Sequence, residues 1–382
     1  MVLFCAGPNY TMSVIVRKKG HRPDYALIAC LGFLVIFGLV MLASASSNLG
    51  QARFGDSYFY FRHQLYYGLS LGLVGFFIAS KFYYGNYRNR FINIPFLILT
   101  LFLLLMVFTP LGLTAGGGTR WLDIGPFSFQ PAELLKLSLI MYLAGWLARR
   151  EYKGEQFVRD FMPMFLVFAC IAGILLAQKS TSPVAILLAT AMCMYFISGA
   201  RWRYIIGVVA GATLVLGLII GFSDYRSERI QAFLNPELYA QGKGYQVIQS
   251  MTAIGAGGLT GVGYGQSTVK FRLPEPIGDS IFAVIAEELG FIGALLLLSA
   301  IGFLVIRTFL LARHTSDPFG RLLLIGFGSI IGIQSVVNIG SMTGVLPLTG
   351  APLPFISYGG TTLAVFMTIG GIIVNVSKYS ER

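Results

Sequence analysis

The stretch Leu273–Ile306 reads LPEPIGDSIFAVIAEELGFIGALLLLSAIGFLVI and joins the chain's only long polar segment to an apolar run. From residue 281 to residue 306 the only charged side chains are those of Glu287 and Glu288. A helix needs about 20 consecutive apolar residues to cross the hydrocarbon core of a bilayer. The stretch therefore predicts a membrane-spanning helix whose first residues adjoin a polar loop with acidic side chains.

Nine further apolar runs of this kind occur along the chain. They cover residues 25–45, 64–80, 92–109, 133–148, 160–177, 183–200, 204–222, 321–345 and 355–376. Only 12% of the 382 residues are charged and 55% are hydrophobic, whereas soluble domains carry about 25% charged residues. Unbroken apolar blocks also exclude a β-barrel, whose strands alternate. We expect an all-α polytopic membrane protein with one domain of about ten transmembrane helices over residues 25–376.

The basic residues predict how this domain sits in the membrane. With the N-terminus inside, 18 of the 28 Lys and Arg residues fall on the cytoplasmic side, and only four fall in the short loops opposite. Short cytoplasmic loops of membrane proteins carry such an excess. We therefore expect residues 1–24 and 377–382 to be cytoplasmic tails. Residues 223–280, between the seventh and eighth helices, would form a large extracellular loop.

The formal net charge of +12 raises the question of nucleic acid as a partner. In a membrane protein the bias toward basic cytoplasmic loops produces the same imbalance. We expect membrane lipids as partners and no nucleic acid, and we expect the protein in the cytoplasmic (inner) membrane.

Asp279 is the first candidate functional residue. Pro274 and Pro276 keep the preceding chain out of a helix, because proline lacks a donor N–H and restrains the residue before it. Asp279 then falls where the following helix begins. One interpretation is an N-cap, worth about 0.5–2 kcal/mol. The other is a carboxylate at the membrane surface that accepts a proton from a sugar hydroxyl or binds a divalent cation, Mg²⁺ or Mn²⁺.

Glu287 and Glu288 lie two helical turns deeper in the same span. A charge within a membrane helix costs about 2.5–3.5 kcal/mol on insertion scales. We expect at least one of the two carboxylates to have a polar or cationic partner.

A second group of candidates lies in the stretch Gly116–Tyr142, GGGTRWLDIGPFSFQPAELLKLSLIMY. Arg120 and Trp121 precede the fourth span, and Glu133 and Lys136 are one helical turn apart at its start. A local ion pair beside an interfacial Trp is one interpretation. The other is that Arg120 and Lys136 bind pyrophosphate oxygens, which suit the planar guanidinium and the point charge of an ammonium.

Arg226 and Arg229 are three residues apart in DYRSERIQAFLNP, at the start of the large loop. On a short helix they share one face, and they lie on the side of the membrane that basic residues usually avoid. They could bind an anionic ligand, or lipid headgroups.

The stretch Asn338–Thr362, NIGSMTGVLPLTGAPLPFISYGGTT, is dense in Gly and Pro. Such a segment breaks a helix and lets the backbone bend back at membrane depth, which is tolerated only where protein or a wet cavity covers it. The stretch predicts an architectural feature more than a chemical one.

These motifs together resemble the SEDS family of membrane proteins (shape, elongation, division and sporulation), whose members include RodA and FtsW. The stretches that carry the resemblance occur in order over nearly the whole chain. They are MLASASS, GGTRWLDIGPFSFQPAELLKL, RIQAFLNP, GYQVIQSMTAIGAGGLTGVGYG, LPEPIGDSIFAVIAEELGFIG and NIGSMTGVLPLTGAPLPFISYGG.

The resemblance implies ten transmembrane helices and polymerisation of lipid II into glycan strands on the outer face of the cytoplasmic membrane. It implies a class B penicillin-binding protein, a transpeptidase, as partner. The family's essential aspartate corresponds to Asp279, and the Glu of its LPE motif to Glu275. The remaining site residues that it implies are Arg120, Trp121, Lys136, Arg226 and Arg229.

The chain departs from the family's pattern at two places. The family usually has HTDF around the aspartate, where this chain has Ile277, Gly278, Asp279 and Ser280. It usually has QPDLGT after the fifth span, and here residues 178–183 read QKSTSP. The second carboxylate is therefore absent, and Lys179 adds a cation. The motifs do not separate the division branch from the elongation branch.

The expected function is that of an inverting glycosyltransferase in which Asp279 is the general base and a candidate ligand of a divalent cation. Lys270 joins Arg120, Lys136, Arg226 and Arg229 as a candidate to offset the charge of the leaving pyrophosphate. The alternatives are a lipid II flippase or transporter, and a non-catalytic scaffold of the division or elongation machinery. A transporter should place ionisable residues near the midplane, whereas here they gather at the outer mouth.

Overall fold

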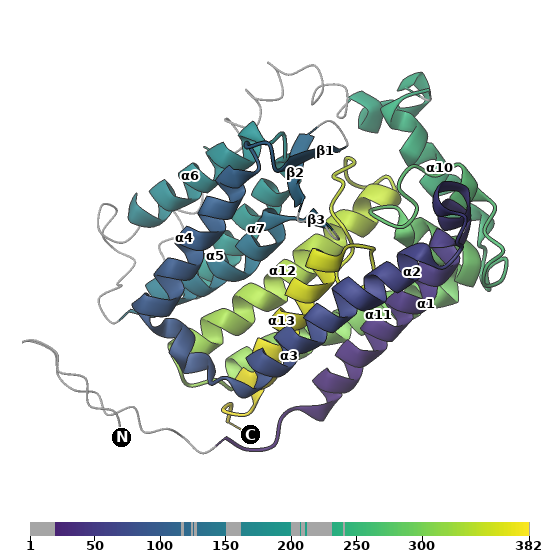
Figure 1. Cartoon of the computed structure of the whole chain (residues 1–382). Helices are drawn as coiled ribbons and strands as arrows, with labels where there is room; N and C mark the ends of the chain where they lie inside the picture. Colours follow the sequence, from purple (N-terminus) through teal and green to yellow (C-terminus); the bar gives the residue numbers. More distant parts are fainter. Residues whose placement is uncertain are drawn as a thin grey trace, which may run out of the picture.

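The computed structural model describes residues 20–115, 118–123, 125, 128–149, 162–199, 207, 211, 231–239 and 241–381. Within these residues the chain forms a bundle of long helices that stand beside one another (Figure 1). The predicted span 204–222, apart from residues 207 and 211, and the Arg226 and Arg229 pair lie outside the described residues.

The other nine predicted spans all correspond to helices of the described chain. These are α1 (Tyr25–Phe54), α2 (Phe59–His63) continued by the π-helix η1 (Gln64–Leu69) and α3 (Ser70–Lys81), α4 (Arg90–Met106), α5 (Pro131–Leu147), α6 (Met162–Ala177), α7 (Thr181–Ile197), α11 (Ile281–Arg313), α12 (Pro318–Met342) and α13 (Gly360–Ser377). By length and composition, four of the described helices can cross a membrane, namely α1, α11, α12 and α13. The all-α polytopic membrane fold is confirmed.

Helix α1 is capped at both ends by residues that satisfy free backbone groups. The Oδ1 atom of Asp24 accepts hydrogen bonds from the N–H groups of Ala26 and Leu27, which caps the first turn. The helix ends at Gly55, whose φ of 69° lets its N–H return to the carbonyl of Gln51. The helix extends nine residues beyond the predicted apolar run, continues through Gly50, and has Phe54 as its last helical residue.

Helices α12 and α13 form the centre of the bundle, and most of their side chains are buried. Helix α13 packs along α3, and α12 contacts α5, α7 and α11. The outer helices expose large apolar side chains, among them Ile36, Phe77, Ile98 and Leu296. An exposed apolar surface of this extent indicates a lipid environment.

The two ends of the bundle differ in character (Figure 1). At one end, which we call the termini end (residues 20–24 and 377–381), the N–H of His21 bonds the carbonyl of Lys378 at 2.9 Å. At the opposite end, the loop end, lie the irregular connections. They contain β1 (Gly112–Ala115), β2 (Gly118–Asp123), β3 (Ser128–Phe129), the 3-10 helices η4 (Pro236–Tyr239) and η5 (Val269–Phe271), and α10 (Lys243–Ala256).

The three strands form a small antiparallel sheet in the order β1, β2, β3. The sequence analysis placed Arg120 and Trp121 before the fourth span and predicted no secondary structure for this connection. Strands of two to six residues are too short for the alternation of apolar and polar residues to distinguish them from a loop.

Residues 343–359 are irregular, as the Gly and Pro content predicted. Helix α12 ends at Met342, and α13 begins at Gly360 rather than at residue 355. Phe355 has a φ of +66°, which a helix cannot accommodate. The second half of the segment, residues 351–357, is covered by protein: Leu353 is fully buried, and a Cβ atom on Gly38 of α1 would lie 2.6 Å from the carbonyl oxygen of Phe355. The condition for non-helical backbone at membrane depth is therefore met for these residues.

Helix α11 is broken at Gly290, where φ is 66° and ψ is −165°. The break frees backbone carbonyls, and the Gly-rich loop satisfies them: Val262 N–H donates to the carbonyl of Glu287 at 3.0 Å. Gly261 lies against the carbonyl of Glu288 so closely that a Cβ atom could not fit. The GAGGLTGVGYG run is thus a packing surface for a kinked membrane helix.

Candidate functional site

Asp279 lies in the turn that leads into α11, and its side chain is half-buried. Ser280 is the N-cap residue of α11, so the N-cap interpretation of Asp279 is wrong by one position. The turn is fixed through its backbone, because Asn338 Nδ2 donates to the carbonyl of Asp279 at 2.8 Å and Ser280 Oγ donates to that of Pro274 at 2.9 Å. The position of the carboxylate therefore depends on α12.

Segment 343–359 lies against this turn. A Cβ atom on Gly350 would be 3.8 Å from Asp279 Oδ2, so the absence of a side chain there leaves room at the carboxylate. The same Asn338 Nδ2 donates to the carbonyl of Ala351 at 2.7 Å, and Gln334 Nε2 donates to that of Pro352 at 2.7 Å. Two amides on one face of α12 thus hold the two segments that border Asp279, which are the Asp279 turn and segment 343–359. We call these two segments the walls of the site.

Lys136 is buried beneath these walls. Its Nζ lies 2.6 Å from Glu133 Oε1 and donates to Gln334 Oε1 at 2.8 Å, with the Phe366 ring centroid 5.4 Å away. The local ion pair considered from the sequence is present. Only 2% of Lys136 is exposed, which does not fit direct contact with a substrate pyrophosphate. Its contact with Gln334 instead orients that amide toward segment 343–359.

Lys270 is buried as well, on η5. Its Nζ lies 3.3 Å from Glu288 Oε1 and donates to the carbonyl of Gly265 at 2.8 Å. Both Glu288 carboxylate oxygens lie 2.6 Å from Ser44 Oγ of α1. The prediction that at least one of the two glutamates has a polar or cationic partner is confirmed. Direct binding of pyrophosphate by Lys270 does not fit its burial.

Glu287 has a different set of partners. Its carboxylate accepts from the N–H groups of Thr268 at 3.0 Å and Val269 at 3.3 Å, and from Ser267 Oγ. Burial, and then the nearby Glu288 carboxylate, raise the pKa of Tyr264 in the same loop. The Tyr264 hydroxyl donates to the carbonyl of Val40 at 2.8 Å. These contacts attach the end of the large loop to α1 and to the first half of α11.

Arg120 lies on β2 and is half-buried. Its Nη2 donates to the carbonyl of Lys179 at 2.6 Å. Lys179 has a φ of 57° and an exposed side chain. Three residues further, Ser182 Oγ donates to the carbonyl of Thr349, next to the glycine that faces Asp279. Residues 178–182 therefore connect the Arg120 strand to segment 343–359, whose Gly350 faces Asp279, and they bring a cation, Lys179, to the loop end.

Trp121 follows on β2, half-buried and in register with Leu113 of β1. Glu275 is exposed in the Asp279 turn with a φ of 51°, and its Oε2 would lie 3.6 Å from a Cβ atom on Gly278. The structure thus gathers Arg120, Trp121, Glu275 and Asp279 at the loop end.

The described residues contain no group of three or more His, Cys, Asp and Glu side chains placed to hold a metal ion. The carboxylates of the Asp279 turn are those of Asp279 and Glu275. A divalent cation at this place would need most of its oxygen ligands from substrate and water, an arrangement that suits Mg²⁺.

The sequence analysis did not single out Gln334 and Asn338. Their signal was present: two amide side chains four residues apart, on one face of an otherwise apolar span. Polar residues inside a membrane helix are costly unless they meet partners, and here the partners are backbone carbonyls of the site.

Comparison with known proteins sets this geometry in a family. The cell cycle protein family of FtsW, RodA and SpoVE matches residues 24–382. The chain belongs to this family. The resemblance to SEDS proteins noted from the motifs is thereby confirmed.

Two curated members of the FtsW/RodA/SpoVE family illustrate the similarity. The probable peptidoglycan glycosyltransferase FtsW of Geobacter sp. (strain M18) is 38% identical over 363 residues, covering 94% of this chain and 98% of the relative. The stage V sporulation protein E of Bacillus subtilis (strain 168) is 36% identical over 369 residues, covering 96% and 100%.

Solved structures agree with this placement in the family. A chain of a peptidoglycan synthase complex that coordinates polymerization and crosslinking matches with a TM-score of 0.78 at 27% identity, over 93% of this chain and 97% of that one. The rod shape determining protein RodA of Thermus thermophilus matches with a TM-score of 0.69 at 26% identity, over 94% and 98%.

Proposed function

We propose that this protein is a peptidoglycan glycosyltransferase that polymerises lipid II into glycan strands at its loop end. Relatives such as the Geobacter FtsW carry this activity in their names and align over nearly the whole chain. The observation that carries the assignment to a site is the half-buried Asp279 in a turn held by Asn338, facing the bare backbone of Gly350. A carboxylate in this setting can accept a proton from a hydroxyl group.

The reaction uses two lipid-linked sugars. The 4-hydroxyl of the acceptor's GlcNAc attacks the anomeric carbon of the growing strand, forming a C–O bond with inversion. The bond between that carbon and the polyprenyl pyrophosphate breaks, and the pyrophosphate leaves with the electron pair. Asp279 takes the hydroxyl proton as general base, a role that contributes about 10²–10⁴-fold.

The leaving pyrophosphate needs positive charge, and preorganised cations supply the largest part of such stabilisation. Arg120 on β2 and the exposed Lys179 are the candidates among the described residues. The contact of Ser182 with Thr349 joins them to segment 343–359, which lies against the Asp279 turn. Arg226 and Arg229 remain candidates from the sequence. Trp121 and Glu275 are proposed to contact the sugars.

Lys136 and Lys270 receive a positioning role in this proposal. Their ion pairs with Glu133 and Glu288 are buried, so they act through Gln334 and through the end of the large loop. A bound Mg²⁺ or Mn²⁺, held by Asp279 and pyrophosphate oxygens, would supply additional charge neutralisation for the leaving group.

The location follows from the distribution of basic residues. We propose that the protein lies in the cytoplasmic (inner) membrane with both termini inside, so that the loop end, with residues 223–280, meets the extracellular water. The domain layout then follows: residues 25–376 span the membrane between two short tails. We also propose a class B penicillin-binding protein as partner, supported by the similarity to a complex that couples polymerization and crosslinking.

The test is made with the purified chain and fluorescent lipid II in proteoliposomes, with and without the partner. We expect glycan strands that a muramidase digests, on the side where the loop end lies. Movement of lipid II across the bilayer without strands would instead indicate a transporter. No strands and no movement, even with the partner present, would indicate a scaffold.

A further inference from the structure

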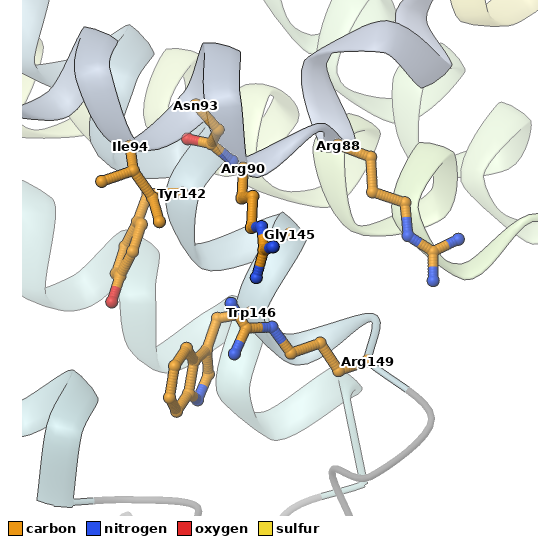
Figure 2. A pocket seen from close by; sticks show the side chains of 8 residues that line it. All are labelled: Arg88, Arg90, Asn93, Ile94, Tyr142, Gly145, Trp146 and Arg149. Atoms are coloured by element: carbon orange, nitrogen blue, oxygen red, sulfur yellow. The ribbon is translucent and has the colours of Figure 1, made fainter. Parts of the chain in front are cut away.

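A cavity of about 320 Å³ lies at the termini end of the bundle, between the start of α4 and the end of α5 (Figure 2). Three of its lining side chains are those of Arg88, Arg90 and Arg149. Asp279 is at the opposite end of the bundle, so the proposed glycosyl transfer makes no use of this cavity. Its volume falls in the range of small-molecule sites.

The described lining of the cavity contains three arginines and no acidic side chain. Arg90 and Arg149 form no salt bridge with any described residue, whereas Arg88 has Asp317 at 4.0 Å. The Arg149 guanidinium stacks 4.3 Å from the Trp146 ring centroid. In Figure 2 the Arg90 side chain descends from α4 toward Trp146. All three arginines are exposed, and Arg149 is positioned by its contact with Trp146. Guanidinium groups bind phosphate through paired N–H donors.

A buried acceptor lies beside these cations. Asn93 lines the cavity and is 4% exposed, and its Nδ2 donates to the carbonyl of Met141 at 2.9 Å. Its Oδ1 is buried and accepts no hydrogen bond from the described residues. A buried acceptor without a partner costs about 1–3 kcal/mol. This oxygen has almost no accessible surface, so a ligand in the cavity reaches it only after the Asn93 side chain moves.

The cavity also adjoins the lipid-facing surface. Ile94 lines it and is 38% exposed, and Ile98 and Leu105 continue an exposed apolar stripe along α4. Trp146 and Tyr142 border the cavity on α5, and such aromatic side chains are enriched where headgroups meet hydrocarbon. A ligand with a headgroup in the cavity can therefore lay its acyl chains along α4. A free anion would gain nothing from this stripe.

We propose that this cavity binds the headgroup of an anionic phospholipid such as phosphatidylglycerol. The phosphate lies between the guanidinium groups of Arg90 and Arg149. Basic pockets between membrane helices bind lipid headgroups by the same charge complementarity. The proposal concerns binding alone and stands independently of the glycosyl transfer.

The test is native mass spectrometry of the whole delipidated protein in detergent, titrated with phosphatidylglycerol. The Arg90→Gln/Arg149→Gln variant should bind this lipid about 30-fold more weakly, because each basic side chain near a headgroup contributes about 1 kcal/mol. The matched control is Arg313→Gln/Arg321→Gln, which removes the same charge from exposed arginines outside the cavity at the same end. We expect the control to bind like the wild type, and circular dichroism melts should show both variants folded.

Three outcomes would overturn the proposal. Equal weakening in both double variants would reduce the effect to general surface charge. Wild-type binding of phosphatidylcholine as tight as that of phosphatidylglycerol would exclude recognition of the anionic headgroup. Displacement of the lipid by millimolar inorganic phosphate would show that the cavity takes a free anion instead.

Discussion

Asn338 is the side chain on which the candidate site depends most. A single amide nitrogen donates both to the carbonyl of Asp279 and to that of Ala351, so the two walls of the site share one donor. Each buried carbonyl left without a donor costs about 1–3 kcal/mol. Much of that cost can be avoided if the walls separate, and the Asp279 carboxylate would then move.

We therefore expect Asn338→Leu to lower kcat about 10- to 100-fold while KM for lipid II changes little, because a misplaced group affects the chemical step more than binding. The control is Ser335→Ala on the same helix, whose hydroxyl bonds only the local carbonyl of Ile331. Steady-state polymerisation kinetics measure both parameters. An unchanged kcat in Asn338→Leu would show that the amide does not position the base.

Lys270 and Glu288 form the buried ion pair that joins the end of the large loop to α11. Removing one partner of such a pair leaves an uncompensated buried charge, at a cost of about 3–5 kcal/mol. Lys270→Met should therefore lower the thermal stability in detergent markedly.

The double variant Lys270→Met/Glu288→Leu should recover part of this loss, because the stranded carboxylate is gone. Thermal unfolding of the two single variants and the double variant forms a thermodynamic cycle. If the effects of the single variants simply add, the two side chains are not coupled.

Helix α11 is interrupted by a kink at Gly290. Gly290 has a left-handed φ, and a Cβ atom there would collide with the backbone of Gly261. The kink therefore requires glycine at both positions. The two half-helices it creates allow Glu287 and Glu288 to turn toward the large loop.

We expect Gly290→Ala to destabilise the protein by more than about 1 kcal/mol, since strain and collision act together. Gly302→Ala in the same helix, where nothing lies within 4 Å of the new Cβ atom, should be neutral or stabilise by up to about 1 kcal/mol. Differential scanning fluorimetry of the two variants tests this contrast. Equal melting temperatures would contradict the role assigned to the kink.

The sequence predicted which segments are helical because apolar runs report burial in lipid directly. The motifs singled out Asp279 and Arg120, and the structure places both at the loop end, while their roles stay predictions. The sequence could not predict the kink, since a glycine within a membrane span is compatible with a continuous helix and the φ of Gly290 depends on contacts with Gly261. It could not reveal that Lys136 is buried, because the partner Gln334 lies 198 residues away along the chain.

The two ends of the protein carry different functional groups, and in a membrane they would face opposite sides. The loop end carries the Asp279 turn and the small sheet, and the termini end carries the arginine-lined cavity (Figures 1 and 2). Because basic residues gather at the termini end, we expect that end in the cytoplasm.

Single cysteines test this orientation in a background in which the four native cysteines are replaced by serine. Thr260→Cys places an exposed thiol at the loop end, and Ser316→Cys places one at the termini end. We expect a membrane-impermeant maleimide to label residue 260 in intact cells freed of their outer layers, and residue 316 only after permeabilisation. The reverse pattern would contradict the orientation and with it the outward-facing site.

The rate at which purified Asp279→Asn protein elongates labelled lipid II tests the assignment of the general base most directly. Glu237→Gln, which neutralises another exposed carboxylate of the large loop, serves as the matched control, with folding of both variants checked by thermal unfolding. We expect Asp279→Asn to lose at least about 100-fold in rate while Glu237→Gln keeps the wild-type rate. Glycan strands that lengthen at the wild-type rate in Asp279→Asn would show that this carboxylate is not the base.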